Sequence, residues 1–158
     1  MKTLTVLSSL LLALMAGPLQ ATQIEIEELW LRESVPGAEN GAGFGKLRNI
    51  GEEDTALVSV AADIADDVEI HQHTHRNGEM VMEQIESLLI PAGETVSLRP
   101  GGYHIMLMGL HERLATGESH SLTLHFADGS EQQLQVEVRD LMQQDDQQSH
   151  GHGSHRAQ

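Results

Sequence analysis

The sequence predicts an all-β protein, a sandwich or barrel of short strands. From residue 22 to residue 140 the apolar residues alternate with polar ones instead of recurring at helical spacing, and this alternation places them on one face of an extended strand. Gly, Pro, Asn and Asp interrupt the pattern about every ten residues, the rhythm of an all-β fold. We therefore expect one β-domain and no α/β enzyme core.

An apolar leader precedes the alternating pattern. Residues 1–21 carry a lysine at position 2, continue with an apolar run over positions 4–15 and end in a Gly-Pro break and a small residue. The run is shorter than the roughly 20 residues of a membrane-spanning helix. We expect residues 1–21 to be a cleavable signal peptide, with no stable insertion in the membrane; a retained N-terminal anchor is the alternative.

The net charge and the absence of cysteine exclude several classes of partner and of active site. The 158-residue chain has a formal net charge of −15 and contains no cysteine. Its acidic surface repels nucleic acid and anionic membranes, so we expect neither as a partner. The absence of cysteine excludes disulfides, thiolate catalysis and the cysteine ligand of a blue copper centre. Any metal must therefore be held by His, Met or carboxylate side chains.

In the first predicted strand, the apolar residues change from even to odd positions. Ile24 and Ile26 share one face, whereas Leu29 and Leu31 continue the pattern one residue later. Such a shift predicts a bulge or a bend between the two pairs. Further strands are expected in the segments "TALVSV", "SLTLHF" and "QLQVEV".

The last two strands are predicted to form a hairpin around "ADGSE". If Asp128 and Gly129 alone formed the loop, the apolar sets of the two strands would lie on opposite faces. A three-residue loop, Asp128 to Ser130, pairs Leu124 with Leu134 and places both sets on the core face. We favour the three-residue loop.

Histidine and methionine gather on one face of the strand that follows "RPGG". Alternation in "YHIMLMGL" leaves His104, Met106 and Met108 together. The natural core set of this segment is Tyr103, Ile105 and Leu107.

A second group of these residue types lies in "HQHTHRNGEMVME", residues 71–83. If Asn77 and Gly78 are the central residues of a type I′ turn, the histidines before the turn face the methionines after it. A loop one residue longer would move both methionines to the other face, and the segment would then be two solvated strands around a turn. With the type I′ turn, the following side chains lie on one face: His71, His73, His75, Met80 and Met82.

The two groups favour the same metal. Thioether is a soft ligand and imidazole a borderline one, so together they suit Cu(I) better than zinc, calcium or magnesium. Methionine in a strand is more often a core residue than a ligand, but two separate His/Met groups at same-face spacing favour binding. The remaining histidines of the predicted domain have no such partner and are expected to be solvated or bound by polar neighbours: His111, His120 and His125.

The spacing of four of these residues resembles the H-x10-M-x21-H-x-M pattern of the PCuAC-type periplasmic copper chaperones. The matching residues are His71, Met82, His104 and Met106. The segments "GAGFGKLRNIGEEDTAL" and "IPAGETVSLRPGGYHIMLMGL" also look like that family. The resemblance implies a cupredoxin-like Greek-key β-barrel or sandwich that holds Cu(I) near its surface through these four side chains. His73, His75 and Met80 are candidate auxiliary ligands. His73 and His75 depart from a typical member of that family, and their imidazoles would let this segment hold Cu(II) as well.

The resemblance also implies a role. Members of that family are associated with delivering copper to the CuA centre of cytochrome oxidase, alongside Sco-type proteins. We therefore expect a monomeric periplasmic chaperone, not an enzyme, whose partner is a copper-accepting protein such as the CuA subunit or a Sco-type protein. The alternative is a periplasmic protein that buffers copper or zinc without a dedicated acceptor. A cupin-type metalloenzyme would require a carboxylate in the cluster and a substrate pocket, and the sequence indicates neither.

The apolar pattern ends at residue 141. The segment 141–158 is polar and without periodicity, so we expect a flexible tail. Its histidines, His150, His152 and His155, are separated by Gly and Ser and can wrap a divalent ion. In this they resemble the His- or Met-rich extension that takes part in Cu(II) binding in some members of the family; a plain solvated tail is the alternative. The expected organisation is a signal peptide (1–21), a copper-binding domain (22–140) and a His-rich tail (141–158).

Overall fold

The computed structural model describes residues 23–140, which form ten β-strands. The predicted signal peptide and the tail with His150, His152 and His155 lie outside the described residues. None of the described residues belongs to a helix long and apolar enough to cross a membrane. The strands are β1 (Ile24–Arg32), β2 (Asn40–Asn49), β3 (Thr55–Ala62), β4 (Ala65–Arg76), β5 (Glu79–Ile85), β6 (Leu88–Ile90), β7 (Thr95–Leu98), β8 (His104–Leu110), β9 (Ser119–Phe126) and β10 (Glu131–Arg139).

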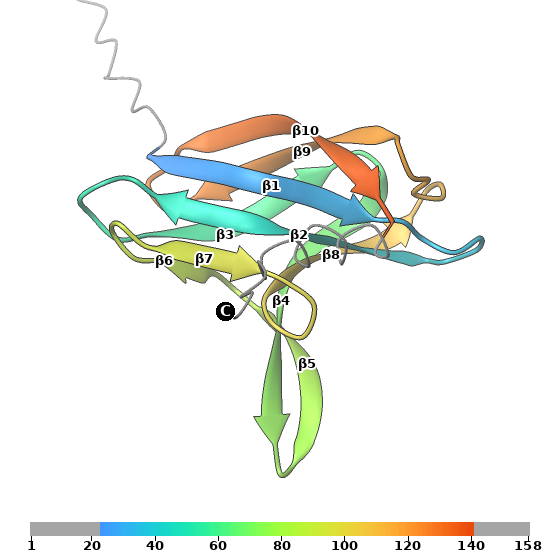
Figure 1. Cartoon of the computed structure of the whole chain (residues 1–158), viewed down its shortest axis with the longest axis horizontal. Helices are drawn as coiled ribbons and strands as arrows, with labels where there is room; N and C mark the ends of the chain where they lie inside the picture. The colour runs from blue at the N-terminus through green and yellow to red at the C-terminus, as the bar shows by residue number, and fades with distance from the viewer. Residues whose placement is uncertain (1–22, 141–158) are drawn as a thin grey trace, which may run out of the picture.

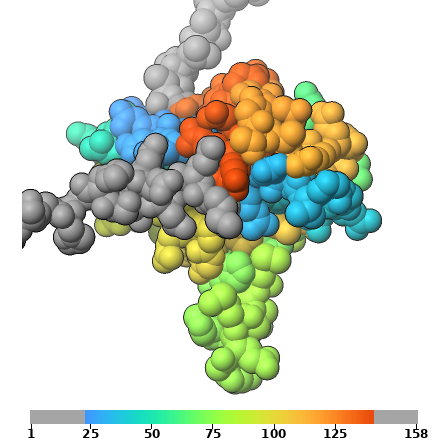
Figure 2. All heavy atoms as spheres, turned by 45° about the vertical axis from the view of Figure 1, so that its right-hand side comes forward, coloured from blue at the N-terminus to red at the C-terminus, as the bar shows by residue number. Residues whose placement is uncertain are grey.

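All ten strands belong to one curved sheet (Figure 1). Its order is β5-β4-β8-β2-β1-β10-β9-β3-β6, and β7 pairs with β2 beside this path. The pair β1–β10 is parallel and the other strand pairs are antiparallel. The all-β class is confirmed, and the sheet folds around its core without closing. The hairpin β4–β5 projects away from the body of the molecule (Figures 1 and 2).

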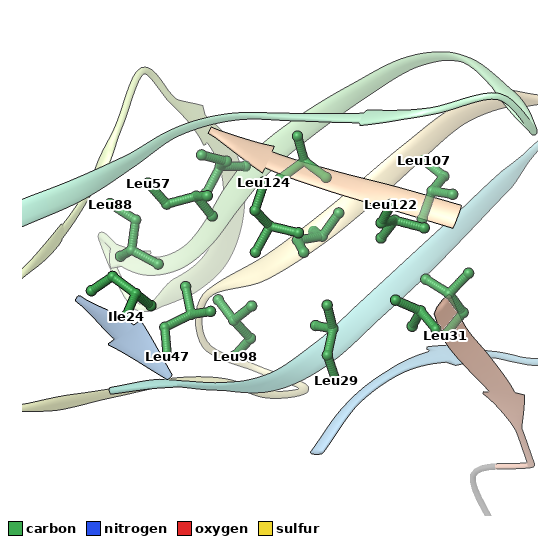
Figure 3. Packing of buried hydrophobic residues seen from close by; sticks show 14 of the residues in the cluster. Ile24, Leu29, Leu31, Leu47, Leu57, Leu88, Leu98, Leu107, Leu122 and Leu124 are labelled. Carbon is green, nitrogen blue, oxygen red and sulfur yellow. The ribbon is translucent and has the colours of Figure 1, made fainter. Parts of the chain in front are cut away.

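The main core is almost entirely aliphatic. Figure 3 shows leucine side chains from opposite parts of the sheet facing one another, among them Leu31, Leu47 and Leu124. A second, smaller cluster contains Trp30, Ala42 and Phe44. Trp30 and Phe44 are paired across β1 and β2, with ring centroids 5.1 Å apart. The Trp30–Phe44 pair is thus separate from the main core, in which Phe126 is the aromatic residue.

The bulge predicted in β1 is confirmed. Its register against β2 shifts between Glu27 and Trp30, and Glu28 has a φ of 52°. Gly45 accommodates this bulge, because a Cβ atom at that position would lie 2.8 Å from the Leu29 Cα. The extra residue turns Trp30 away from the aliphatic core, and the residues on either side of it, Leu29 and Leu31, point into that core.

The β9–β10 hairpin has the predicted loop length but a different position. The loop is Ala127 to Gly129, so Leu134 pairs with Leu122 and not with Leu124. Gly129 adopts a φ of 82°, which glycine reaches without strain, and fixes where the chain turns. Leu122 and Leu134 are directly paired, so both apolar sets still share the core face, as predicted.

Tyr103 does not belong to the core. Its side chain is 37% exposed, whereas Ile105 and Leu107 are fully buried. β8 begins only at His104, and Tyr103 makes an isolated bridge to Leu98, the last residue of β7. The alternation rule therefore applies from His104 onward.

Candidate metal centre

Three neighbouring strands position the candidate ligands on one face of the sheet. β4 lies between β5 and β8. On one side the register pairs His71 with His104. On the other side it pairs His73 with Met82. Because side chains two residues apart in a strand share a face, Met106 lies on this same face.

The turn between β4 and β5 has the predicted geometry. Asn77 and Gly78 have φ values of 53° and 86°, the two positive values of a type I′ turn. Arg76 is paired with Glu79 and His75 with Met80, as that turn requires. The register on which the histidine and methionine pairing depends is therefore confirmed.

Three imidazole rings come together at the base of the hairpin. The ring centroid of His104 lies 5.7 Å from that of His71 and 5.1 Å from that of His73. His71 and His104 are buried, with 9% and 4% of their surface exposed. Met106 is half-buried next to them in the sheet, and Met82 is 44% exposed on the hairpin. His75 and Met80 are exposed and lie nearer the turn.

The hydrogen bonds of the rings leave lone pairs for a metal. Nδ1 of His104 donates to the Gly102 carbonyl oxygen at 3.1 Å, so its Nε2 carries the lone pair. Nδ1 of His71 and Nδ1 of His73 are buried and have no hydrogen-bond partner. A buried polar atom without a partner costs free energy unless a ligand satisfies it. The donor set therefore fits a metal ion that accepts imidazole and thioether ligands.

Glu69 and the aromatic pair were not anticipated from the sequence. The Glu69 carboxylate lies 2.5 Å from Nε2 of His71, and the register pairs Glu69 with Met106. Its position two residues before His71 in a strand was the available signal. Phe44 lies behind His104, with ring centroids 6.3 Å apart. Among residues 23–140, no three or more His, Asp or Glu side chains are placed to hold a metal by themselves.

The other histidines of the described chain lie outside this cluster. His111 contacts Asp66 and the Asp63 carbonyl oxygen at 3.0 and 3.1 Å. His125 lies 3.3 Å from Glu131, and His120 lies 3.7 Å from Glu118. Each of these three rings has a carboxylate neighbour, but Nε2 of His120 is buried and has no hydrogen-bond partner, which differs from the expectation for that residue.

Burial lowers the pKa of His104 from the ordinary 6.5, although the hydrogen bond to Gly102 acts in the opposite direction. The hydrogen bond to Asp66 raises the pKa of His111. We therefore expect the His104 ring proton signals to titrate at lower pH than those of His111 in an NMR titration of the metal-free protein. Identical midpoints would contradict the burial of His104.

The same shift has a consequence for folding. The unfolded chain takes up a proton on His104 at higher pH than the folded protein does. The contribution of His104 to stability is therefore complete above about pH 6.5 and decreases as the pH falls through that value towards the folded pKa.

Comparison with known proteins places the chain in a family. The family model described as putative lipoprotein LpqE-like matches residues 24–138. The putative lipoprotein Lxx21020 of Leifsonia xyli subsp. xyli is 36% identical over 123 residues, which cover 77% of this chain and 73% of that protein. The uncharacterized protein RP573 of Rickettsia prowazekii is 29% identical over 100 residues, which cover 63% of this chain and 55% of that protein.

Solved structures share the fold. The Cu(I)-bound DR1885 of Deinococcus radiodurans superposes with a TM-score of 0.63 at 29% identity, covering 77% of this chain and 81% of that one. The copper-bound PCuAC domain of PmoF2 gives a TM-score of 0.64 at 21% identity, covering 77% of this chain and 96% of that one. These neighbours confirm the predicted cupredoxin-like fold. The chain therefore belongs to the LpqE-like family, which is related to the PCuAC proteins whose fold it shares.

Proposed function

We propose that this protein is a periplasmic copper carrier that binds Cu(I) through His71, Met82, His104 and Met106. The observation that carries the proposal is the register of β5, β4 and β8, which brings imidazole and thioether side chains from three strands to one face. Two solved structures with this fold contain copper. The family description and the Leifsonia relative, both of which name a putative lipoprotein, support a secreted, envelope-associated location.

The chemistry of the donors favours Cu(I). Four neutral ligands leave the ion with its own charge, and two thioethers are soft donors that zinc uses little. The partnerless nitrogen of His71 and the lone pair of His104 lie in a buried environment, which limits access of water. A monovalent soft ion is the species that such a set holds best.

The exposure of the ligands suits transfer. His71 and His104 are buried, whereas Met82 is 44% exposed. Met82 belongs to β5, in the hairpin that projects from the body of the molecule (Figure 2). An acceptor can therefore approach from the hairpin side and replace the thioether of Met82 before the imidazoles. Copper would pass by ligand exchange, without catalysis, to a protein such as the CuA subunit of cytochrome c oxidase or a Sco-type protein. The predicted tail with His150, His152 and His155 would capture Cu(II) near the domain.

Substitution of Met82 tests this function. We expect Met82→Ala to lower Cu(I) affinity by about tenfold or more, which is about 1.4 kcal/mol, in an anaerobic competition with a chromophoric Cu(I) chelator. Met80→Ala is the matched comparison: Met80 lies on the same face but is more exposed and pairs with the outer His75, so as an auxiliary ligand it should lower the affinity less than Met82→Ala does. Equal affinities of Met82→Ala and the wild type would refute the proposed site.

A second candidate, a copper or zinc buffer without a dedicated acceptor, is favoured by His73 and Glu69. The imidazole of His73 is a borderline donor and the carboxylate of Glu69 is a hard donor, and both lie beside the proposed ligands. Zinc accepts both kinds of donor. Competition between Zn²⁺ and Cu(I) distinguishes the two. Zinc that displaces Cu(I) at equal concentration would favour the buffer, and Cu(I) bound unchanged in excess zinc would favour the carrier.

A further inference from the structure

The contact between Glu69 and His71 has a specific geometry. Glu69 precedes His71 by two residues in β4, so the two side chains lie on the same face of the sheet. Oε2 of Glu69 lies 2.5 Å from Nε2 of His71, and the two side chains are only 22% and 11% exposed. A carboxylate–imidazole contact this short and this shielded constrains the histidine ring.

The contact determines which nitrogen of His71 carries the hydrogen. A carboxylate only accepts hydrogen bonds, so Nε2 must be the donor and Nδ1 holds the lone pair. That Nδ1 is buried and without a hydrogen-bond partner. In the opposite tautomer, the Nε2 lone pair would face the carboxylate and Nδ1–H would be a buried donor without an acceptor, and both arrangements are unfavourable.

The two buried histidines therefore present different atoms. His104 donates through Nδ1 to the Gly102 carbonyl oxygen, which leaves the lone pair on Nε2. His71 donates through Nε2 and leaves the lone pair on Nδ1. The rings are cross-strand partners with centroids 5.7 Å apart. Two rings of opposite tautomer can thus direct their lone pairs to one ion from neighbouring strands.

We propose that Glu69 is a positioning residue, which fixes the tautomer and orientation of His71 and makes Nδ1 its copper-binding atom. This inference rests on the proposed function, since it concerns the same site. Carboxylates that hold the second nitrogen of a metal-binding histidine typically contribute tenfold to a hundredfold to metal affinity. Glu69 therefore acts through His71 and does not itself bind the ion.

The tautomer is tested first in the metal-free protein. In the full chain labelled with ¹⁵N-histidine, we expect long-range ¹H–¹⁵N NMR to show His71 as the Nε2–H tautomer, with a downfield, slowly exchanging ring N–H signal. Glu69→Ala is expected to abolish that signal. The control Glu53→Ala removes the same charge at an exposed loop position and is expected to preserve it. His71 in the Nδ1–H form, or a signal unaffected by Glu69→Ala, would overturn the inference.

Cu(I) addition then identifies the binding atoms. Cu(I) is diamagnetic, so the same spectra can be recorded for the loaded protein. We expect the ¹⁵N resonance of Nδ1 to shift in His71 and that of Nε2 to shift in His104. A shift of Nε2 in His71 would overturn this inference and leave the proposed function intact. If no ring nitrogen of His71 or His104 shifted, the proposed function itself would fail.

A double-mutant cycle separates positioning from direct binding. We expect Glu69→Ala to reduce Cu(I) affinity by about tenfold to a hundredfold, and to have little further effect in a His71→Ala background. An equal loss in both backgrounds would show that Glu69 binds copper itself and would overturn the positioning role. Far-UV circular dichroism checks that each variant is folded.

Discussion

Replacement of His104 by alanine is expected to lower Cu(I) affinity by about a hundredfold or more, equivalent to about 2.8 kcal/mol. His104 is the central ring of the cluster, in contact with both His71 and His73, and only 4% exposed. The hydrogen bond from Nδ1 to the Gly102 carbonyl oxygen already orients the ring and leaves the lone pair on Nε2. The substitution therefore removes a ligand that is held in position before the metal binds. The affinity is measured anaerobically by chelator competition.

The control for this prediction is His125→Ala. His125 is a β9 residue beside Glu131 and outside the cluster, so this substitution should preserve Cu(I) affinity. Trp30 gives an independent signal, because it is the only tryptophan of the chain and contacts Phe44, which in turn contacts His104. Cu(I) should quench Trp30 fluorescence in the wild type and less in His104→Ala. Unchanged affinity and quenching would remove His104 from the site.

Leu31→Ala is expected to reduce the free energy of unfolding by about 3–5 kcal/mol. Leu31 is fully buried and is paired with Gly43 on one side and Val138 on the other. Its Cδ2 would lie 3.2 Å from a Cβ atom at Gly43, so the leucine fills the space that the glycine leaves. The chain has no cysteine and therefore no disulfide to offset the cavity.

Urea unfolding of the metal-free protein measures this loss. Val35→Ala is the matched control, because Val35 is 72% exposed and should change the unfolding free energy by no more than about 0.5 kcal/mol. Where Leu31→Ala remains folded, Cu(I) affinity should equal that of the wild type. A loss below about 1 kcal/mol would show that neighbouring side chains fill the cavity.

Local rules predicted some features from the sequence because few conformations satisfied them. Asn77 and Gly78 both tolerate positive φ, which selects the type I′ turn and with it the pairing of His73 with Met82. The parity change between Ile26 and Leu29 required a bulge or a bend, and the structure has the bulge. In both cases, the residues themselves determine the geometry.

The alternation of apolar and polar residues does not determine the position of a hairpin loop or the order of strands in a sheet. Pairing Leu134 with Leu122 or with Leu124 leaves the same residues on the core face, so the position of the β9–β10 loop was not determined by the pattern. The placement of β4 between β5 and β8 is a tertiary property. Without it, Glu69 could not be distinguished from a solvated carboxylate, and the contact with His71 was missed.

The strand that carries Met82 is also the last strand on its side of the described sheet. An edge strand offers unpaired backbone groups to which a second molecule can add, and this route leads to aggregation. β5 begins with Glu79 and contains Glu83, which pairs with Arg76 at 2.8 Å. Charged side chains on an edge strand oppose the addition of a second strand. The hairpin can therefore expose a methionine to an acceptor and still resist edge-to-edge association with its own copies.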